Sequence, residues 1–209
     1  SRGLGDVYKR QASKHIGRGN EKAADQAAVD AMRKCLNSLT ISGTVVIGEG
    51  ERDEAPMLYI GENVGAGGPK VDIALDPLEG TTITAKGGEN AMAVIALAQE
   101  GGFLNAPDVY MKKISTNTNN EKVVSLDQDL KSNIKDLAKF KKINIEDLVI
   151  CILDRERHKD EIEIIRSTGA RIKMIDDGDV SAVISSVLIS SSIDTVSYTH
   201  LRAHETSQH

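Results

Sequence analysis

Apolar positions recur along this 209-residue chain at two spacings, one typical of helices and one typical of strands. Residues 21–39 show the clearest helical spacing, because small apolar side chains return every three or four positions. Short apolar runs predict strands at 44–47, 71–75, 91–98 and 148–153. The run at 91–98 is rich in alanine, a strong helix former, so its assignment as a strand follows from its position along the chain.

The second half of the chain alternates between helical and strand-like patterns. A mostly polar segment at 125–140 and an amphipathic segment at 159–167 predict helices, and 171–175 predicts a strand. A further helix is expected at about 178–188, followed by a strand that begins near Ile193. This order of helices and strands, without internal repeats, predicts a layered α/β fold.

The composition narrows the class of protein. The formal net charge is −5, from 26 Lys and Arg against 31 Asp and Glu, which disfavours nucleic acid and membrane surfaces as partners. There is no run of about 18 apolar residues and no recognisable signal peptide. The two cysteines form neither a disulfide framework nor a zinc-binding spacing. We therefore expect a cytoplasmic protein.

The segment 71–82, VDIALDPLEGTT, carries the most informative chemistry. A short run of strand-forming residues leads into two acidic residues, Asp76 and Glu79. Pro77 is expected to end the strand pairing because it lacks an amide hydrogen, and Gly80 is expected to allow a tight turn. The two carboxylates can then face the same cavity at the end of the strand.

Carboxylates in this arrangement are typical ligands of hard divalent cations such as Mg²⁺ and Mn²⁺. The main-chain amides around Gly80 and Thr81 could receive a phosphate group. For an Asp-Pro pair taken alone, a strand followed by an acidic turn is the alternative. The complete string from Asp76 to Thr81 favours the metal site.

This string resembles the D-P-[IL]-[DE]-G-T signature of the metal-dependent, lithium-sensitive sugar phosphatases, which include inositol monophosphatases and fructose-1,6-bisphosphatases. Three further segments resemble class II fructose-1,6-bisphosphatase, the bacterial type: GEGE at 48–51, DEAPMLYIGE at 53–62 and NAPDVYM at 105–111. The resemblance extends over 12–195. It implies the α+β layered sandwich of that superfamily, with Mn²⁺ or Mg²⁺ as the cofactor.

The resemblance also implies a cup of four metal-binding carboxylates. Glu49, after a predicted strand, and Asp25, on the first helix, join Asp76 and Glu79 in this cup. Crowded carboxylates repel one another, so the cup would be strained without a cation. Asp25 taken alone could equally be a solvated helix residue. Thr81 is implied to position or activate the attacking water, and alternatively its hydroxyl caps the following segment.

Residues implied to bind the substrate lie mainly in the second half of the chain. Arg155 and Arg157 follow a predicted buried strand, where α/β proteins commonly bind ligands, and they point to the same side if the strand direction continues. Two guanidinium groups can hold the distal phosphate of a bisphosphate, although an Arg-Glu-Arg run alone is usually a solvated surface. The other implied substrate-binding residues are Glu79, Gly80, Thr81, Tyr110, Asp177, Gly178 and Asp179.

For the full-length parent, the resemblance implies hydrolysis of the 1-phosphate of fructose 1,6-bisphosphate to fructose 6-phosphate and phosphate, in gluconeogenesis. Sedoheptulose 1,7-bisphosphate is an alternative substrate, and an inositol-phosphatase-like enzyme is an alternative within the superfamily. A metal- or phosphate-binding fragment without turnover is the alternative from another class. The expected partner is a small-molecule sugar bisphosphate, and the full-length enzyme is a candidate homo-oligomer.

Both ends of the chain differ from that family. Residues 1–11 and 196–209 resemble translated sequencing-adapter text, and we interpret them as artefacts. An irregular or weakly packed conformation is therefore expected for 196–209. The family continues instead into a glycine-rich segment with another metal-ligating glutamate, so the fold of 12–195 is expected to be incomplete and the isolated chain inactive.

Overall fold

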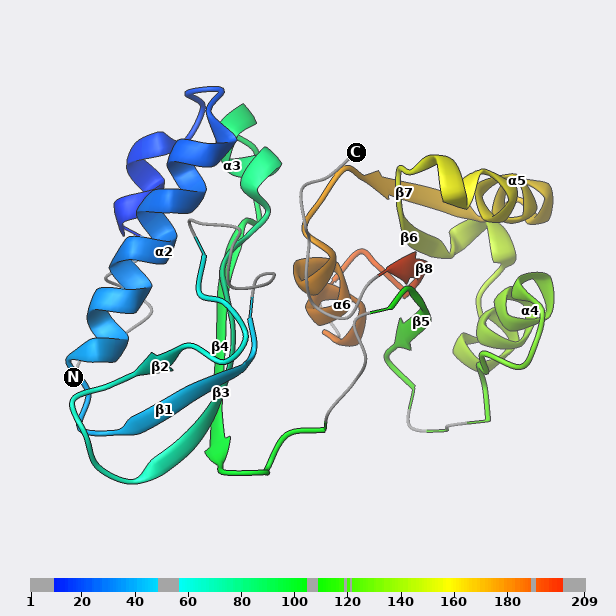
Figure 1. Ribbon diagram of the computed structural model, residues 1–209. Helices are drawn as coiled ribbons and strands as arrows, with labels where there is room; N and C mark the ends of the chain where they lie inside the picture. Colours follow the sequence, from blue (N-terminus) through cyan, green and yellow to red (C-terminus); the bar gives the residue numbers. More distant parts are fainter. Residues whose placement is uncertain are drawn as a thin grey trace. The chain divides into compact units, whose positions relative to one another are not determined.

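The computed structural model describes residues 10–48, 57–104, 109–118, 120, 122–188 and 191–200. The described residues divide into two compact units, one within 10–104 and the other within 109–200 (Figure 1). Each unit has its own sheet and its own apolar core. None of the helices in the described ranges is long and apolar enough to cross a membrane.

The first unit contains a four-stranded sheet in the order β2-β1-β3-β4. Strands β1 (Ser42–Ile47) and β3 (Lys70–Glu79) are parallel, whereas β2 (Asn63–Val64) and β4 (Met92–Gln99) run antiparallel to their neighbours. The long helix α2 (Glu21–Asn37) packs on this sheet. Two short helices, η1 (Ser13–His15) and α3 (Thr81–Lys86), contact α2.

Helix α2 forms where the apolar spacing predicted it. The Asn20 side chain caps the helix by accepting a hydrogen bond from the Ala23 amide at 3.0 Å. In the first turns of the helix, Ala24 and Ala28 pack against Leu78, which places these turns beside the end of β3. Farther along, the helix, the sheet and the segment before β2 share a core of Val29, Met32, Leu36, Val45, Leu58, Val64, Ile73 and Leu75.

Strand β3 is longer than predicted, because it continues through Pro77 to Glu79. The expectation that Pro77 ends the strand pairing is therefore wrong. The pairs Asp76–Val94 and Glu79–Met92 enclose one extra residue on β3, which is a bulge. Proline, which has no amide hydrogen for a regular ladder, is tolerated in such a bulge.

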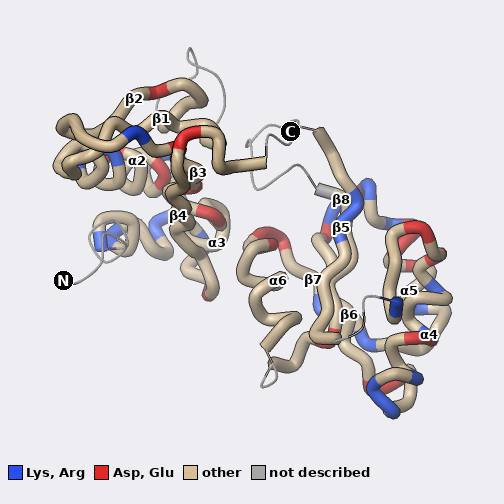
Figure 2. Tube along the Cα trace, turned by 90° about the horizontal axis from the view of Figure 1, so that it is seen from below, with Lys and Arg blue, Asp and Glu red and all other residues tan. Residues whose placement is uncertain are grey.

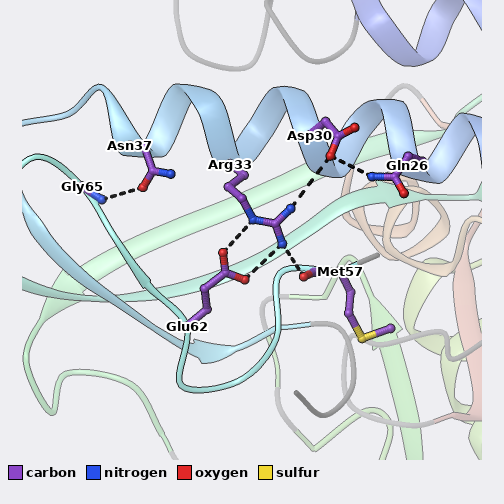
Figure 3. Close-up of polar contacts among 7 residues, drawn as sticks. All are labelled: Gln26, Asp30, Arg33, Asn37, Met57, Glu62 and Gly65. Atoms are coloured by element: carbon purple, nitrogen blue, oxygen red, sulfur yellow. Dashed lines mark hydrogen bonds and ion pairs between the residues drawn. The ribbon is translucent and has the colours of Figure 1, made fainter. Parts of the chain in front are cut away.

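An ion pair fastens the loop before β2 to helix α2 (Figure 3). The Arg33 guanidinium donates to both carboxylate oxygens of Glu62, at 2.7 and 3.2 Å, and to the carbonyl oxygen of Met57. The hydrogen bond to Glu62 raises the pKa of Arg33. One turn farther along α2, the Asn37 side chain accepts a hydrogen bond from the Gly65 amide. These contacts hold 57–65 against the helix.

The second unit contains a sheet in the order β5-β8-β6-β7. Strand β6 (Val149–Leu153) lies parallel to β7 (Arg171–Ile175) and β8 (Thr195–His200), and β5 (Met111–Thr116) is antiparallel to β8. In Figure 1, the helices α4 (Leu130–Lys141) and α5 (Lys159–Thr168) lie on one side of this sheet and α6 (Asp179–Val187) on the other. The turns η2 (Ile145–Asp147) and η3 (Glu156–His158) flank β6.

The buried run of β6 lies at the centre of the second core, with apolar residues of α4, α5 and β8 around it. At the start of this strand, the Asp194 carboxylate accepts a hydrogen bond from the Val149 amide at 2.8 Å and pairs with the Lys141 amine at 2.6 Å. The Asp194 carbonyl oxygen also accepts from the Thr116 hydroxyl. The mixed sheets and their helices confirm the predicted α/β class.

One expectation about the end of the chain is wrong where the structure describes it. Thr195–His200 form strand β8, which pairs with both β5 and β6, instead of an irregular segment. Val196 and Tyr198 are buried. Alternating side chains in this segment suit a strand that packs one face, and its two neighbours supply hydrogen-bond partners. The interpretation of 1–11 and 196–209 as artefacts stays a prediction.

Candidate active site

The ends of two parallel strands define one edge of the first sheet. Strand β1 ends at Ile47, which pairs with Ala74, and β3 continues in the same direction to Glu79, so both strands have their carboxyl ends at this edge. In α/β proteins, ligands commonly bind outside the carboxyl ends of parallel strands. The predicted motif from Asp76 to Thr81 lies at this edge.

The bulge in β3 turns both carboxylates of the motif to one face of the sheet. Residues that pair across antiparallel strands point to the same side, and Val94 and Met92 lie two positions apart on β4. Their partners, Asp76 and Glu79, therefore point to the same face of the sheet. In a regular strand, two residues three positions apart would point to opposite faces. Leu78, which lies inside the bulge, packs with Ala24 and Ala28 of α2. The Asp76 and Glu79 side chains are both buried, at 6% and 3% exposed.

Asp25 is carried by the first turns of α2, beside the contact between Ala24 and Leu78. Its Oδ1 atom is buried and has no hydrogen-bond partner among the residues that the structure describes. Burial raises the pKa of this carboxyl group from 3.8 to about 6. A freely solvated helix residue would not show this shift, whereas a nearby cation would offset its cause.

Carboxylate oxygens are typical ligands of hard divalent cations. The buried Asp25 Oδ1 atom, which has no hydrogen-bond partner among the described residues, could be neutralised by such a cation. The fourth expected ligand, Glu49, lies outside the described residues. Within the described ranges, no three His, Cys, Asp or Glu side chains are close enough to hold a metal ion. The complete cup therefore stays a prediction.

Gly80 makes the turn that separates the strand from helix α3. Its φ is 96°, and a Cβ atom there would lie 3.2 Å from the Ala91 Cα, so glycine is needed on both grounds. Gly80 is also the N-cap, and Thr81 is the first helical residue. The alternative in which the Thr81 hydroxyl caps the helix is wrong, because the capping position belongs to a residue without a side chain. The role of Thr81 toward water stays a prediction.

The second sheet has a corresponding edge, at the carboxyl ends of β6, β7 and β8. Leu153 pairs with Ile175 near this edge, and Met111, the first residue of the antiparallel β5, pairs with His200 there. The segments just beyond these strand ends carry the predicted substrate-binding residues of this unit. The structure therefore brings to one edge Tyr110, Arg155, Arg157, Asp177, Gly178 and Asp179.

Arg157 has two defined contacts at this edge. Its Nε atom donates to the Thr199 carbonyl oxygen at 2.9 Å, and its Cζ atom lies 5.0 Å from the centre of the Tyr110 ring. Strand β6 has ended at Leu153, and Arg157 lies in the turn η3. The strand direction does not continue, so the alternation that would point Arg155 and Arg157 to the same side does not apply.

The loop before α6 places two buried aspartates around Gly178, whose φ is 85°. The Tyr198 hydroxyl donates to Asp179 Oδ2 at 3.2 Å, and the Lys113 amine lies 5.9 Å from the Tyr198 ring centre. Burial lowers the pKa of Lys113, and the Asp179 carboxylate partly opposes this. Sequence reasoning missed Lys113 and Tyr198. The pair of lysines at 112–113 in β5, blue in Figure 2, is the sequence signal that could have drawn attention to this strand.

His158, to which sequence reasoning assigned no catalytic role, is fully buried. Its Nδ1 atom lies 2.9 Å from the Leu153 carbonyl oxygen, and its Nε2 atom accepts from the Thr199 amide at 2.9 Å. The Nε2 atom also lies 3.0 Å from the Thr199 carbonyl oxygen, and burial lowers the pKa of His158. His158 thus fastens η3 to β8 beside Arg157, a function that its charged sequence neighbours do not reveal.

Comparison with known proteins agrees with the motifs. The family described as bacterial fructose-1,6-bisphosphatase, glpX-encoded, matches residues 9–199. The D-fructose 1,6-bisphosphatase class 2/sedoheptulose 1,7-bisphosphatase of Synechococcus sp. (strain JA-2-3B'a(2-13)) is 46% identical over 187 residues, covering 83% of this chain and 54% of that protein. The protein of the same name from Parasynechococcus marenigrum (strain WH8102) is 49% identical over 175 residues, covering 83% and 52%.

The chain spans about half the length of these curated relatives. The family match extends over most of the chain and includes both sheets. The motif at the carboxyl edge of the first sheet and the similarity to these relatives lead to one conclusion: the chain belongs to the bacterial, glpX-encoded fructose-1,6-bisphosphatase family.

Proposed function

We propose that the chain is part of a phosphatase that hydrolyses the 1-phosphate of fructose 1,6-bisphosphate to give fructose 6-phosphate and phosphate, a reaction of gluconeogenesis. The observation that carries this proposal is the bulge in β3, which turns Asp76 and Glu79 to one face at the carboxyl edge of the sheet. Two buried carboxylates at such an edge suit a metal-dependent phosphatase. Membership of the family supports the same class of reaction.

Asp25, Glu49, Asp76 and Glu79 would hold Mn²⁺ or Mg²⁺, the cations that suit an all-carboxylate set. When bound, such a cation makes water more acidic and offsets the negative charge of the phosphate and of the leaving oxygen. Thr81 orients the attacking water with its hydroxyl. The main-chain amides that follow Glu79 receive the phosphate group, because amides at the start of a helix such as α3 have no partner within the helix.

The remaining predicted residues bind the rest of the substrate. Arg155 and Arg157 hold the distal phosphate, since guanidinium groups match phosphate oxygens in pairs. Tyr110 contributes to the same end of the substrate, and the loop 177–179 hydrogen-bonds the sugar hydroxyl groups. This division predicts a preference for bisphosphates over simple phosphate monoesters.

Sedoheptulose 1,7-bisphosphate is a second candidate substrate. The names of both relatives include sedoheptulose 1,7-bisphosphatase. Its two terminal phosphates and its row of hydroxyl groups present the same chemistry as the fructose substrate, with one carbon more. The recognition groups described above therefore do not discriminate strongly against it.

The test uses residues 1–195 of the chain joined to the C-terminal half of a full-length relative. Phosphate release is measured from both sugar bisphosphates and from p-nitrophenyl phosphate, with Mn²⁺ or Mg²⁺ and with a chelator. Metal-dependent turnover that favours the bisphosphates is expected. Glu79→Gln should lower kcat by at least about a hundredfold because it removes a charged ligand oxygen, whereas Glu89→Gln, at an exposed position of the same unit, should not. Normal turnover of Glu79→Gln at saturating Mn²⁺ would refute the assignment.

A further inference from the structure

We propose that Tyr110 acts through Arg157: the tyrosine ring holds the guanidinium in position for a phosphate group, so the ring, and not the hydroxyl, is what binding requires. The inference rests on the proposed function, because it concerns how the distal phosphate is bound. It makes Tyr110 a positioning residue and gives its aromatic side chain a role that is separate from a direct contact with the sugar.

The contact geometry suggests this role. The Arg157 Cζ atom lies 5.0 Å from the centre of the Tyr110 ring, within the distance of about 6 Å at which a cation and an aromatic face attract each other. A second contact restrains the same side chain, because Nε donates to the Thr199 carbonyl oxygen at 2.9 Å. The guanidinium is thus held over the tyrosine ring and through its Nε atom.

The rest of the guanidinium is available to a ligand. Among the residues that the structure describes, the two terminal nitrogens of Arg157 have no hydrogen-bond partner, and the residue is exposed. A planar guanidinium binds two phosphate oxygens through a pair of parallel hydrogen bonds. The contacts with Tyr110 and Thr199 leave such a pair free to form.

The backbone on which these groups stand is fixed. Met111, next to Tyr110, pairs with β8, and His158, next to Arg157, accepts a hydrogen bond from the Thr199 amide. The ring, the guanidinium and the carbonyl oxygen therefore come from three segments that are joined to one another at the carboxyl edge of the sheet. A preformed arrangement of this kind persists without a ligand.

The benefit to binding is entropic. An exposed arginine has many side-chain conformations, and it loses them when it binds a phosphate. A guanidinium that already lies against an aromatic ring loses fewer, so its affinity for the phosphate is higher. Phenylalanine would preserve this effect because it keeps the aromatic face, whereas leucine would remove it.

The test compares Tyr110→Leu with Tyr110→Phe in the 209-residue chain, with Phe140→Leu, an exposed aromatic position on α4, as the control. The Nε–Hε NMR signal of Arg157 reports the ring contact without a ligand, and calorimetry measures the Kd for fructose 1,6-bisphosphate and for fructose 6-phosphate. Tyr110→Leu should shift and sharpen the Arg157 signal and weaken bisphosphate binding by about two- to thirtyfold, the range expected for a cation–π contact. Tyr110→Phe should restore both to near the wild-type values.

Equal losses for the two Tyr110 variants would overturn the inference, because they would assign the effect to the hydroxyl, and they would leave the proposed function intact. An Arg157 signal that is the same in Tyr110→Leu as in the wild type would also overturn it. If the wild-type chain binds no bisphosphate, the proposed function of this edge fails, and the NMR comparison alone then decides whether Tyr110 positions Arg157.

Discussion

Replacing Asp25 with asparagine should stabilise the first unit while it weakens metal binding. Burial raises the pKa of Asp25 from 3.8 to about 6, so the folded state binds this proton more tightly than the unfolded state between these two pH values. The contribution of Asp25 to the stability of the wild type therefore falls as the pH rises from 3.8 to about 6, and it stays low at higher pH. At neutral pH the ionised carboxylate is a cost that asparagine does not have.

The magnitude follows from the shift. Two pKa units correspond to about 3 kcal/mol of unfolding free energy, which is an upper limit because Asp25 is only partly buried. A gain of about 1 to 3 kcal/mol at pH 7.5 is expected for Asp25→Asn, and it should shrink to near zero at about pH 4. Saturating Mn²⁺ should stabilise the wild type much more than the variant, because only the wild type has the charged oxygen.

Urea denaturation of the chain at pH 7.5 and pH 4, each with a chelator and with Mn²⁺, measures these differences. Glu89→Gln controls for the removal of an exposed acid from the same unit. An Asp25→Asn chain that is less stable than the wild type at pH 7.5 in the chelator would contradict a cost of the buried carboxylate. A stabilisation by Mn²⁺ that is equal in both proteins would remove Asp25 from the metal site.

Two further predictions concern structure outside the proposed metal cup. A double-mutant cycle with Arg33→Met and Glu62→Gln should give a coupling free energy of unfolding of about 1 to 3 kcal/mol. The reason is that Arg33 donates two charge-assisted hydrogen bonds to Glu62 and that both side chains are only partly exposed. A coupling free energy below about 0.3 kcal/mol in urea titrations would contradict this prediction. His158, with a lowered pKa caused mainly by burial, should favour the fold above its unfolded pKa of about 6.5 and penalise it as the pH falls below that value. Stability measured at pH 7 and pH 5 should therefore fall more in the wild type than in His158→Gln, and an equal fall would contradict the assignment.

Much of the element order could be predicted from the sequence, because local periodicity determines it. The helix α2 and the strands β6 and β7 follow from apolar spacing alone, and β4 follows from its position despite its alanines. Features that depend on the pairing of one strand with another could not be predicted. Whether Pro77 ends a strand or occupies a bulge depends on its partner in β4, which lies more than a dozen residues away.

The candidate site shows the same division. The motif places Asp76 and Glu79 at a strand end, yet their shared face depends on one extra residue in the register. Arg157 follows a strand as predicted, but the chain turns into η3 before it reaches that residue. The contacts of Arg157 with Tyr110 and Thr199 join positions about 40 or more residues apart, and periodicity contains no information about such contacts.

The carboxylates at the carboxyl edge of the first sheet are proposed to bind a divalent cation. Paramagnetic Mn²⁺ titrated into the ¹⁵N-labelled chain would locate this cation, since nearby amide signals broaden first. Saturable broadening is expected to begin at 76–81 and around Asp25, and the double substitution Asp76→Asn with Glu79→Gln should abolish it. Broadening that begins elsewhere, such as at the acidic first turn of α5, or that survives the double substitution would contradict this proposal.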